Sequence, residues 1–434
     1  MKFGGTSVGS AERMFNVLDI VRGEKQAIVV LSAMSGTTDI LVRLASSLLA
    51  QDKDKAREMI DNLEMQYMEV VRHFKLSTEL NRQGNELVRS HSDFLRSFTI
   101  DMFTSNEEKE VLAQGELLST ALFQLLCMEK KVNSELLPAL NFMRLNEKGE
   151  PDQDYISRHL RRELLKYRNA DYYITQGYIC RNSFGEIDNL KRGGSDYTAT
   201  LIGAAVDAEE IQIWTDIDGM HNNDPRYVRN THPVTELSFE EAAELAYFGA
   251  KILHPTCILP AKNRSIAVKL LNSMDPGARG TLITGRKSEE AKIKAIAAKD
   301  GIVAINIRSD RMLFAYGFLR AVFEVFEKFR TPIDMITTSE VAVSVTIDDV
   351  QYLNRIVEEL NEFGTVEVDE GMSIICIVGN LASDQKGLAS SIFDAVRDIP
   401  IRMISYGGSR HNISILVRTD LKSATLNALN KGLF

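Results

Sequence analysis

An internal repeat in the last third of the chain limits the possible folds more than any other feature. Ile302–Ile307 matches Met372–Ile377 seventy positions later, and Gly317–Phe323 matches Gly387–Phe393 at the same offset. Similarity at a constant offset indicates two copies of one structural unit. Each copy reads as strand, helix, strand, strand and helix. The sequence therefore predicts two α+β domains whose exposed strand edges favour pairing side by side.

The preceding residues predict an α/β domain. Short apolar runs such as 26–33 and 266–271 are typical of strands buried on both faces of a parallel sheet. Apolar residues at helical spacing between 40 and 131 predict a layer of helices beside that sheet. A Gly- and Pro-containing stretch at 275–281 marks the expected end of this domain.

Composition excludes several classes of protein. The 434 residues carry a formal net charge of −9, which argues against a nucleic-acid or membrane-surface partner. We find no export signal and no apolar run near the roughly 18–20 residues that span a bilayer, so we expect a cytoplasmic protein. The four cysteines and seven histidines lack metal-ligand spacing, so we expect no metal site built from these side chains.

Two Gly-Gly turns each lead into a predicted helix. Gly4 and Gly5 follow Lys2, and Ser10 is a suitable N-cap for the helix after them. Such a turn is either an ordinary turn or a phosphate site, in which free N–H groups and the helix dipole favour an anion. Lys2 adds a full positive charge beside it.

The second turn is Arg192-Gly193-Gly194-Ser195-Asp196, with Ser195 as the expected N-cap. Arg192 and Asp196 either form a solvated ion pair or face a substrate that carries both charges. Glu116 is expected near the start of a helix, where it is either a first-turn acid favoured by the helix dipole or a binding residue.

The order of these motifs resembles a known family. The motifs are Lys2–Ser7, Gly115–Glu116, Arg192–Asp196, Trp214–Asp216, Asp224–Arg226 and Gly249–Lys251. Together they closely resemble the aspartokinases of the amino-acid kinase family, and the repeat resembles their paired ACT domains. The resemblance implies an amino-acid kinase domain at 1–285, with a mainly parallel sheet between helical layers. It implies a first ACT domain at 296–368 and a second at 369–434.

The resemblance implies transfer of the γ-phosphoryl group of MgATP to the side-chain carboxylate of L-aspartate, giving 4-phospho-L-aspartate. That carboxylate is already ionised at neutral pH, so no catalytic base is required and positioning of charge is the main task. Lys2 and Asp196 are the implied catalytic residues, Lys2 neutralising phosphoryl oxygens and Asp196 organising Mg²⁺-bound water or substrate. The implied nucleotide contacts are Lys2, Gly4, Gly5, Thr215, Asp216, His221, Arg226 and Lys251.

Four residues are implied to hold aspartate: Thr38, Glu116, Arg192 and Ser195. Arg192 would bind a carboxylate in bidentate fashion and Glu116 the α-ammonium group. Two positions depart from the family. Only Met1 precedes Lys2, where the family has more strand residues, so we expect Lys2 to be weakly anchored. His221 stands where several relatives have Tyr. No G-x-G-x-x-G unit follows the second repeat, so we expect a monofunctional enzyme.

The first repeat resembles the lysine-sensitive type of ACT pair. The implied effector residues are Met312, Phe314, Gly317, Phe318, Leu319, Asp334, Thr338, Ser339 and Glu340. Asp334 and Glu340 are either ammonium-binding acids or solvated turn acids, and the Gly317 loop could bind a carboxylate. We therefore expect feedback inhibition by lysine in the biosynthesis of lysine, threonine and methionine. We also expect a homodimer through the ACT strands.

Two other readings remain open at this point. The chain could phosphorylate another carboxylate or carbamate, but Arg192 with Glu116 suits an α-amino acid. It could also be an amino-acid sensor with an inactive kinase domain, but the presence of Lys2, Asp196 and Lys251 argues against this.

Overall fold

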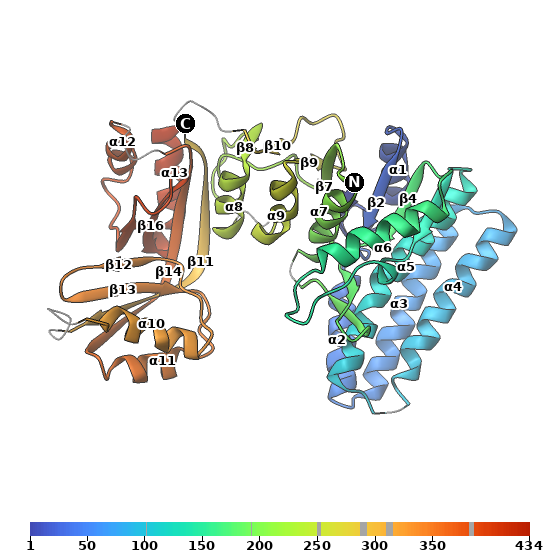
Figure 1. Ribbon diagram of the computed structural model, residues 1–434, viewed down its shortest axis with the longest axis horizontal. Helices are drawn as coiled ribbons and strands as arrows, with labels where there is room; N and C mark the ends of the chain where they lie inside the picture. The colour runs from blue at the N-terminus through green and yellow to red at the C-terminus, as the bar shows by residue number, and fades with distance from the viewer. Residues whose placement is uncertain (101, 192, 250–252, 287–292, 310–315, 382–385) are drawn as a thin grey trace. The chain divides into compact units, whose positions relative to one another are not determined.

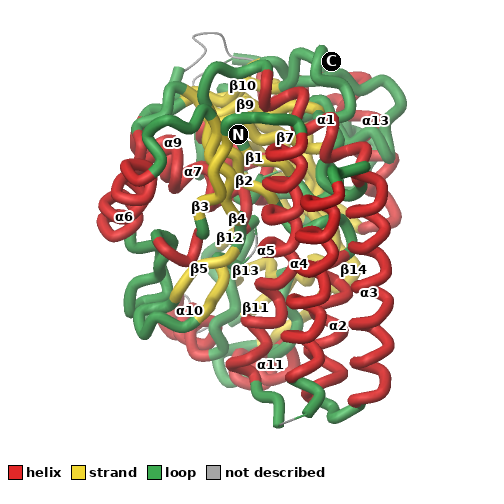
Figure 2. The backbone as a smooth tube through the Cα atoms, turned by 90° about the vertical axis from the view of Figure 1, so that its right-hand side faces the viewer, coloured by secondary structure: helices red, strands yellow, loops and turns green. Residues whose placement is uncertain are grey.

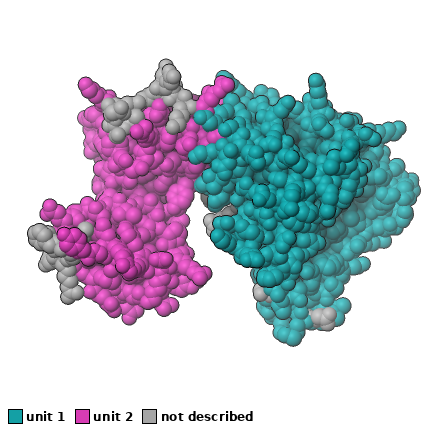
Figure 3. All heavy atoms as spheres, viewed as in Figure 1, with its two compact units in different colours: residues 1–220, 252–285 teal, residues 221–251, 286–434 magenta. Residues whose placement is uncertain are grey.

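The computed structural model describes residues 1–100, 102–191, 193–249, 253–286, 293–309, 316–381 and 386–434. The chain divides into two compact units, coloured separately in Figure 3. The first comprises Met1–Met220 and Ile252–Gly285, and the second comprises His221–Lys251 and Arg286–Phe434. Residues 221–251 thus belong to the second unit, although they lie within the segment 1–285 that we expect to form the kinase domain.

The first unit is built on a mainly parallel sheet, as predicted. Its strands are β1 (Lys2–Phe3), β2 (Ala27–Leu31), β3 (Ser134–Leu137), β4 (Tyr172–Gln176), β7 (Glu210–Thr215), β9 (Ala267–Asn272) and β10 (Thr281–Thr284). They lie in the order β3-β4-β2-β1-β7-β9-β10, and only β10 runs antiparallel to its neighbour β9. The two-residue β1 pairs on both sides, with Lys2 opposite Val30 and Ile213, so its neighbours hold Lys2 in place.

Helices cover both faces of this sheet (Figures 1 and 2). One face carries α1 (Ala11–Arg22), α2 (Thr37–Leu49), α3 (Lys53–Phe74), α4 (Thr78–Ser97) and α5 (Ser105–Glu129). The other carries α6 (Gln153–Lys166), α7 (Gly194–Val206) and α9 (Pro255–Arg264). A separate antiparallel hairpin is formed by β5 (Ile179–Arg181) and β6 (Ile187–Asn189). The helical layer predicted between 40 and 131 is confirmed as four helices.

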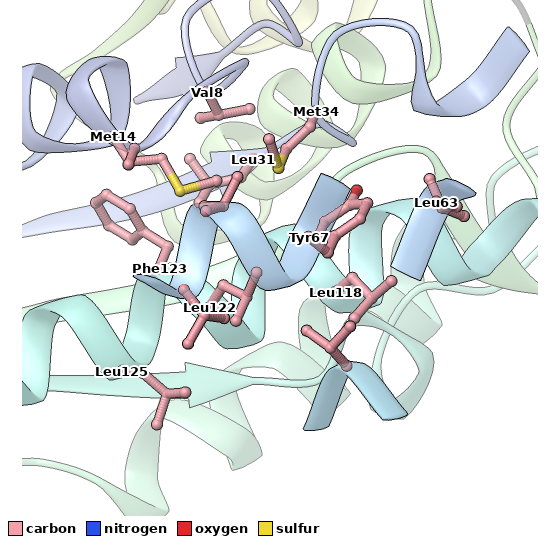
Figure 4. Close-up of a cluster of buried hydrophobic side chains, with 14 of the residues drawn as sticks. Val8, Met14, Leu31, Met34, Leu63, Tyr67, Leu118, Leu122, Phe123 and Leu125 are labelled. Carbon is pink, nitrogen blue, oxygen red and sulfur yellow. The ribbon is translucent and has the colours of Figure 1, made fainter. Parts of the chain in front are cut away.

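Helix α5 forms the centre of the helical layer. Its Leu122 and Phe123 are fully buried in the same cluster as Met14, Leu31 and Tyr67 (Figure 4). Among the described residues, the segment Asn106–Glu129 is the one stretch long and apolar enough to cross a membrane by length and composition alone. Of its most apolar window, 72% is buried in the protein, as in a core helix. Our expectation that no apolar run approaches this length was therefore wrong. The helix is apolar around most of its circumference because it packs against the protein on several sides.

The second unit contains one six-stranded sheet in the order β12-β13-β11-β14-β16-β15. The first repeat supplies β11 (Ile293–Arg308), α10 (Phe318–Lys328), β12 (Ile336–Thr338), β13 (Ala342–Ile347) and α11 (Leu353–Leu360). The second supplies β14 (Thr365–Gly379), α12 (Leu388–Ala395), β15 (Met403–Ser405), β16 (Asn412–Arg418) and α13 (Lys422–Leu433). The predicted α+β repeat and its side-by-side strand pairing are confirmed. The unit also holds β8 (Glu236–Ser238) and α8 (Phe239–Tyr247).

The two repeats are joined through their long first strands. β11 and β14 run antiparallel, so Ile296 lies opposite Ile377 and Ile307 opposite Val366. Ile296 is buried in the hydrophobic cluster of the second repeat, while Val366 packs against that of the first. Each repeat therefore completes its core with a strand segment that extends from the other.

Candidate active site

A cleft of about 420 Å³ lies in the first unit, beyond the carboxyl ends of β1, β2 and β4. Open parallel sheets bind ligands at this edge, where the loops after neighbouring strands converge. The cleft residues lie on β1, on the loops after these strands, on α5 and at the starts of α2 and α7. They include Lys2, Gly5, Thr38, Glu116, Tyr178, Gly193, Gly194, Ser195 and Asp196.

Glycine lets the loops approach one another closely. A Cβ atom at Gly5 would lie 2.9 Å from Ala33 O, which is closer than real Cβ atoms come to a carbonyl oxygen. Gly5 is therefore required for the loops after β1 and β2 to meet at the cleft. The N–H of Gly4 donates to Trp214 O at 3.2 Å, so the expected contact of Gly4 with the nucleotide stays a prediction that would not use this N–H. The short β1 needs this bond to continue its pairing with β7.

Helix α7 begins two residues earlier than predicted. Its N-cap is Gly193, which has φ +68°, and no side chain caps the helix. The prediction of Ser195 as the N-cap was wrong, because a left-handed glycine turns the chain directly into the helix at Gly194. Ser195 instead lies in the first turn, packed so closely on Gly177 that a Cβ there would lie 2.5 Å from Ser195 Oγ. Its hydroxyl is therefore held at the cleft.

Lys2 and Asp196 form a buried ion pair in this cleft. Their Nζ and Oδ1 atoms are 2.7 Å apart, and the side chains are 10% and 12% exposed. Oδ1 has no hydrogen-bond donor in favourable geometry among the described residues, so the contact is an ion pair without a well-directed hydrogen bond. The structure thus brings the two predicted catalytic residues together, although 194 positions separate them in the sequence.

Glu116 lies in the middle of α5, not near a helix start. A capping box formed by Thr104 and Glu107 begins the helix well before it, so Glu116 cannot be a first-turn acid. The residue is 4% exposed, and its Oε2 has no partner among the described residues. Burial raises the pKa of this carboxyl to about 7, opposed by hydrogen bonds from the backbone, chiefly that of Ala33. The cleft therefore contains a carboxylate that would be stabilised by a cation.

Tyr178 is a cleft residue that the sequence reasoning missed. Its φ of +65° is rare for an aromatic residue, and its N–H donates to Thr198 Oγ1 at 3.0 Å. Burial, followed by the charge of Glu116, raises the pKa of its hydroxyl to about 12. The one available signal was the glycine that precedes it, in the sequence Gln176-Gly177-Tyr178. Nothing in the sequence indicated the left-handed backbone.

The predicted nucleotide residues are divided between the two units. Thr215 is the last residue of β7 in the first unit and Asp216 follows it, and the Thr215 hydroxyl accepts a hydrogen bond from Ile217 N at 3.1 Å. His221 and Arg226 belong to the second unit. His221 Nδ1 lies 3.1 Å from Thr231 Oγ1, and Arg226 forms an ion pair of 2.6 Å with Asp224. The predicted contacts Arg192 and Lys251 lie outside the described residues.

The predicted effector residues are partly described. Met312 and Phe314 lie outside the described residues, while Gly317, with φ +89°, is the N-cap of α10. Asp334 is not a solvated turn acid: its side chain is 1% exposed and forms an ion pair of 2.8 Å with Lys299. The remaining predicted residues are Phe318, half-buried against Phe363, and the exposed Leu319, Thr338, Ser339 and Glu340.

Comparisons with known proteins agree with this architecture. Residues 1–272 match the amino acid kinase family, and residues 375–433 match an ACT domain. Lysine-sensitive aspartokinase 3 of Escherichia coli is 34% identical over 100% of this chain and 98% of its own length. Chloroplastic aspartokinase 1 of Arabidopsis thaliana is 32% identical over 100% of this chain and 80% of its own length.

Two solved structures of Escherichia coli aspartokinase III are also similar. One, in complex with aspartate and ADP, matches 100% of this chain and 99% of its own with a TM-score of 0.86 at 32% identity. The other, in complex with lysine and aspartate, matches 100% and 98% with a TM-score of 0.81 at 33% identity. From its kinase-type cleft, its ACT repeats and these full-length matches, the chain belongs to the aspartokinases of the amino acid kinase family.

Proposed function

We propose that this enzyme transfers the γ-phosphoryl group of ATP to the side-chain carboxylate of L-aspartate, giving 4-phospho-L-aspartate. The observation that carries the proposal is that one cleft contains both a cation and a buried carboxylate, which suit ligand groups of opposite charge. The Lys2 ammonium at the Gly-rich turn suits phosphoryl oxygens, while the buried Glu116 carboxylate suits an α-ammonium group. The related Escherichia coli enzyme has been crystallised with aspartate and ADP, which supports the same pair of substrates here.

Catalysis then consists mainly of positioning and charge stabilisation. The substrate carboxylate attacks as an anion, so no side chain has to remove a proton. Lys2 neutralises the charge on the transferring group from a site where burial strengthens its field. Gly5, rather than Gly4, is the better candidate for a backbone donor to that group. Asp196 holds the Lys2 ammonium in place until the nucleotide arrives.

Recognition of aspartate is assigned to Glu116, Arg192, Ser195 and Thr38. Glu116 accepts the α-ammonium group, and the predicted partner of the α-carboxylate is Arg192. Ser195, in the first turn of α7, and Thr38, at the start of α2, add hydroxyl groups at the cleft. The Glu116 carboxylate and the Arg192 guanidinium together select an α-amino acid. The second acidic group of that amino acid is then left to attack the phosphoryl group.

The residues fit a Mg²⁺ ion that arrives with the nucleotide. Among the described residues, no cluster of three or more His, Cys, Asp or Glu side chains could form a metal cage. Mg²⁺ in kinases commonly keeps waters and is held by phosphates with one or two carboxylates. Asp196, with a buried oxygen that lacks a hydrogen-bond donor, would be such a carboxylate. When bound, Mg²⁺ supplies charge neutralisation between the phosphates.

We further assign feedback inhibition by lysine to the first repeat, a cytoplasmic location, and a homodimer formed through ACT strands. The predicted nucleotide contacts Thr215, Asp216, His221, Arg226 and Lys251 remain part of this proposal. The domain limits 1–285, 296–368 and 369–434 also remain predictions. The related aspartokinase III has been crystallised with lysine, which supports lysine as the effector.

Trapping of the acyl phosphate with hydroxylamine tests the proposed reaction. The full-length protein is incubated with ATP, Mg²⁺ and hydroxylamine, and with L-aspartate, L-glutamate or no acceptor. We expect hydroxamate from L-aspartate alone. Equal yields from L-glutamate would shift the assignment to a broader carboxylate kinase, and no hydroxamate from L-aspartate would exclude the proposed function.

A further inference from the structure

Asp334 in the first repeat is already engaged by groups of the protein. Its Oδ1 accepts hydrogen bonds from Lys299 Nζ at 2.8 Å and from Tyr247 OH at 2.6 Å. The side chain is 1% exposed, and Oδ2 has no partner among the described residues. Lys299 also lies 2.9 Å from Asp348 Oδ2 and 4.5 Å from the centre of the Tyr247 ring. The predicted effector acid therefore already binds one primary ammonium group.

Tyr247 links this cluster to α8, of which it is the last residue. Beyond it, Gly249 has φ +119°, and a Cβ atom there would collide with Ala298 O, the neighbour of Lys299 on β11. In the sequence, Lys251 follows Tyr247 by four residues and belongs to the Gly249–Lys251 motif. The end of α8 and the start of this motif are thus held against the strand that carries Lys299.

The rest of α8 is fixed to other parts of the same unit. Glu241 pairs with Lys294 of β11 at 2.8 Å, and the side chains are 2% and 14% exposed. Glu244 accepts hydrogen bonds from Ser409 Oγ at 3.0 Å and from the Asn412 amide in the second repeat. The hydroxyl of Tyr247 is therefore the side-chain contact that ties α8 to the predicted effector acid.

The second repeat has the same pair with its charges reversed. At the offset of seventy, Asp369 on β14 corresponds to Lys299. Arg402 corresponds to Asp334 at an offset of 68, since Ile333–Ile336 matches Ile401–Ile404 and the N–H groups of Asp334 and Arg402 donate to the equivalent residues Thr346 and Leu416. Arg402 Nε lies 2.7 Å from Asp369 Oδ2, and the side chains are 35% and 44% exposed. The position that would receive an ammonium group in the first repeat is thus occupied by a cation in the second, and this cation would repel an ammonium group.

We propose that Lys299 is an internal substitute for the effector's ammonium group, and that the effector acts by taking Asp334 from Lys299 and Tyr247. The inference rests on the proposed feedback inhibition by a primary ammonium compound. Asp348 gives the displaced Lys299 a second carboxylate, so the exchange does not leave a lone ammonium group. Release of the Tyr247 hydroxyl frees the end of α8, and with it the segment that leads to the kinase motif at 249–251.

In this exchange, the affinity for the effector depends on the strength of the internal contacts of Asp334. A ligand shifts a two-state element only by its difference in affinity for the two states. Here the effector binds only when Asp334 has left its internal partners, so the intact cluster opposes binding. Weakening the internal partners should strengthen effector binding, whereas cutting the link to α8 should reduce the response to bound effector.

Lysine inhibition and lysine-induced thermal shift of full-length variants test the proposal. In Lys299→Met, we expect the half-inhibitory lysine concentration to fall by about tenfold or more, because the competitor is gone. In Tyr247→Phe, we expect the lysine-induced thermal shift to persist while the activity that remains at saturating lysine rises. The matched control, Arg402→Met, removes the reversed pair and should leave both readouts as in the wild type.

The outcomes separate this inference from the proposed function. If lysine inhibits the wild type but Lys299→Met is unchanged or less sensitive, the competition is wrong while the feedback assignment stands. If Lys299→Met does not fold, Tyr247→Phe decides: full inhibition in that variant would overturn the coupling. If wild-type aspartate phosphorylation is insensitive to lysine, both the lysine assignment and the inference fail, and the catalytic assignment is untouched.

Discussion

Two buried carboxylates in different units are both predicted to receive the ammonium group of an amino acid, but they are prepared for it in opposite ways. Glu116 in the cleft has no cationic partner among the described residues, and burial raises its pKa to about 7. Asp334 in the first repeat is held by Lys299 and Tyr247. The substrate site, which must bind and release a ligand in every turnover, has no internal group in the place of the ligand. In the regulatory site, groups of the protein occupy that place, so the unliganded state has its own set of contacts.

The two carboxylates should also differ in their contribution to the stability of the folded protein. The open carboxylate of Glu116 is costly at neutral pH, because an ionised group is buried without a counter-charge. The filled carboxylate of Asp334 avoids that cost, but its removal would leave Lys299 with one partner fewer. Function at the first site should therefore be gained at the expense of stability, while at the second site stability and regulation should depend on the same contacts.

The largest effect is expected at the cation that serves the cleft. Lys2→Met removes the charge that faces the transferring group, so turnover should fall by about 10³-fold or more. Steady-state kinetics measures the loss, and circular dichroism at 20 °C checks that the fold is kept. Activity within tenfold of the wild type would remove Lys2 from its catalytic role.

A smaller effect is expected at the filled carboxylate. Asp334→Asn should lower the free energy of unfolding by about 3 kcal/mol, the lower end for breaking a buried pair, because Asp348 still faces Lys299. Lysine inhibition should be lost in the same variant. Chemical denaturation and inhibition assays measure the two effects. Normal inhibition would show that Asp334 is a structural residue only, which would break the comparison.

The open carboxylate should behave in the opposite way when it is neutralised. The pKa of Glu116 is raised in the folded protein, so the stability penalty grows as pH rises from about 4.5 and is complete above about 7. Glu116→Gln should therefore be more stable than the wild type by on the order of 3 kcal/mol at pH 8. The two proteins should be equally stable near pH 4.5. Denaturant titrations at both pH values measure this, and a variant less stable at pH 8 would contradict the open site.

The same carboxyl should control how pH affects the binding of aspartate. Below about pH 7 Glu116 is protonated in the free enzyme and cannot pair with an ammonium group. The KM for L-aspartate should therefore be about tenfold higher at pH 6 than at pH 8, because a full unit below the pKa leaves about a tenth of the sites ionised. A flat KM across this range would place the ammonium group elsewhere.

The smallest effect is expected at the exposed pair of the second repeat. Arg402→Met should cost less than about 1 kcal/mol, since a solvent-screened pair contributes little. Measured beside Asp334→Asn, it sharpens the comparison between a buried and an exposed version of the same contact. A loss as large as that of Asp334→Asn would mean that burial is not what distinguishes the two repeats.

Much of this architecture could be predicted because it depends on local patterns. The repeat offset predicted the paired strands of the second unit, and the two Gly-Gly motifs predicted the loops that meet at the cleft. The position of Glu116 within α5 was missed although a local signal existed, because Thr104 and Glu107 have the spacing of a capping box and place the helix start well before Glu116. The Lys299–Asp334 contact depends on how β11 lies beside the loop before β12, which no spacing rule gives.

Substrate discrimination tests the central claim most directly. Succinate is L-aspartate without its α-ammonium group, so hydroxamate formation from the two acids isolates that group. The wild type should favour L-aspartate over succinate in kcat/KM by about 10²-fold or more, and Glu116→Gln should reduce this preference to about tenfold or less. An unchanged preference in Glu116→Gln, or no hydroxamate from L-aspartate in the wild type, would contradict the account.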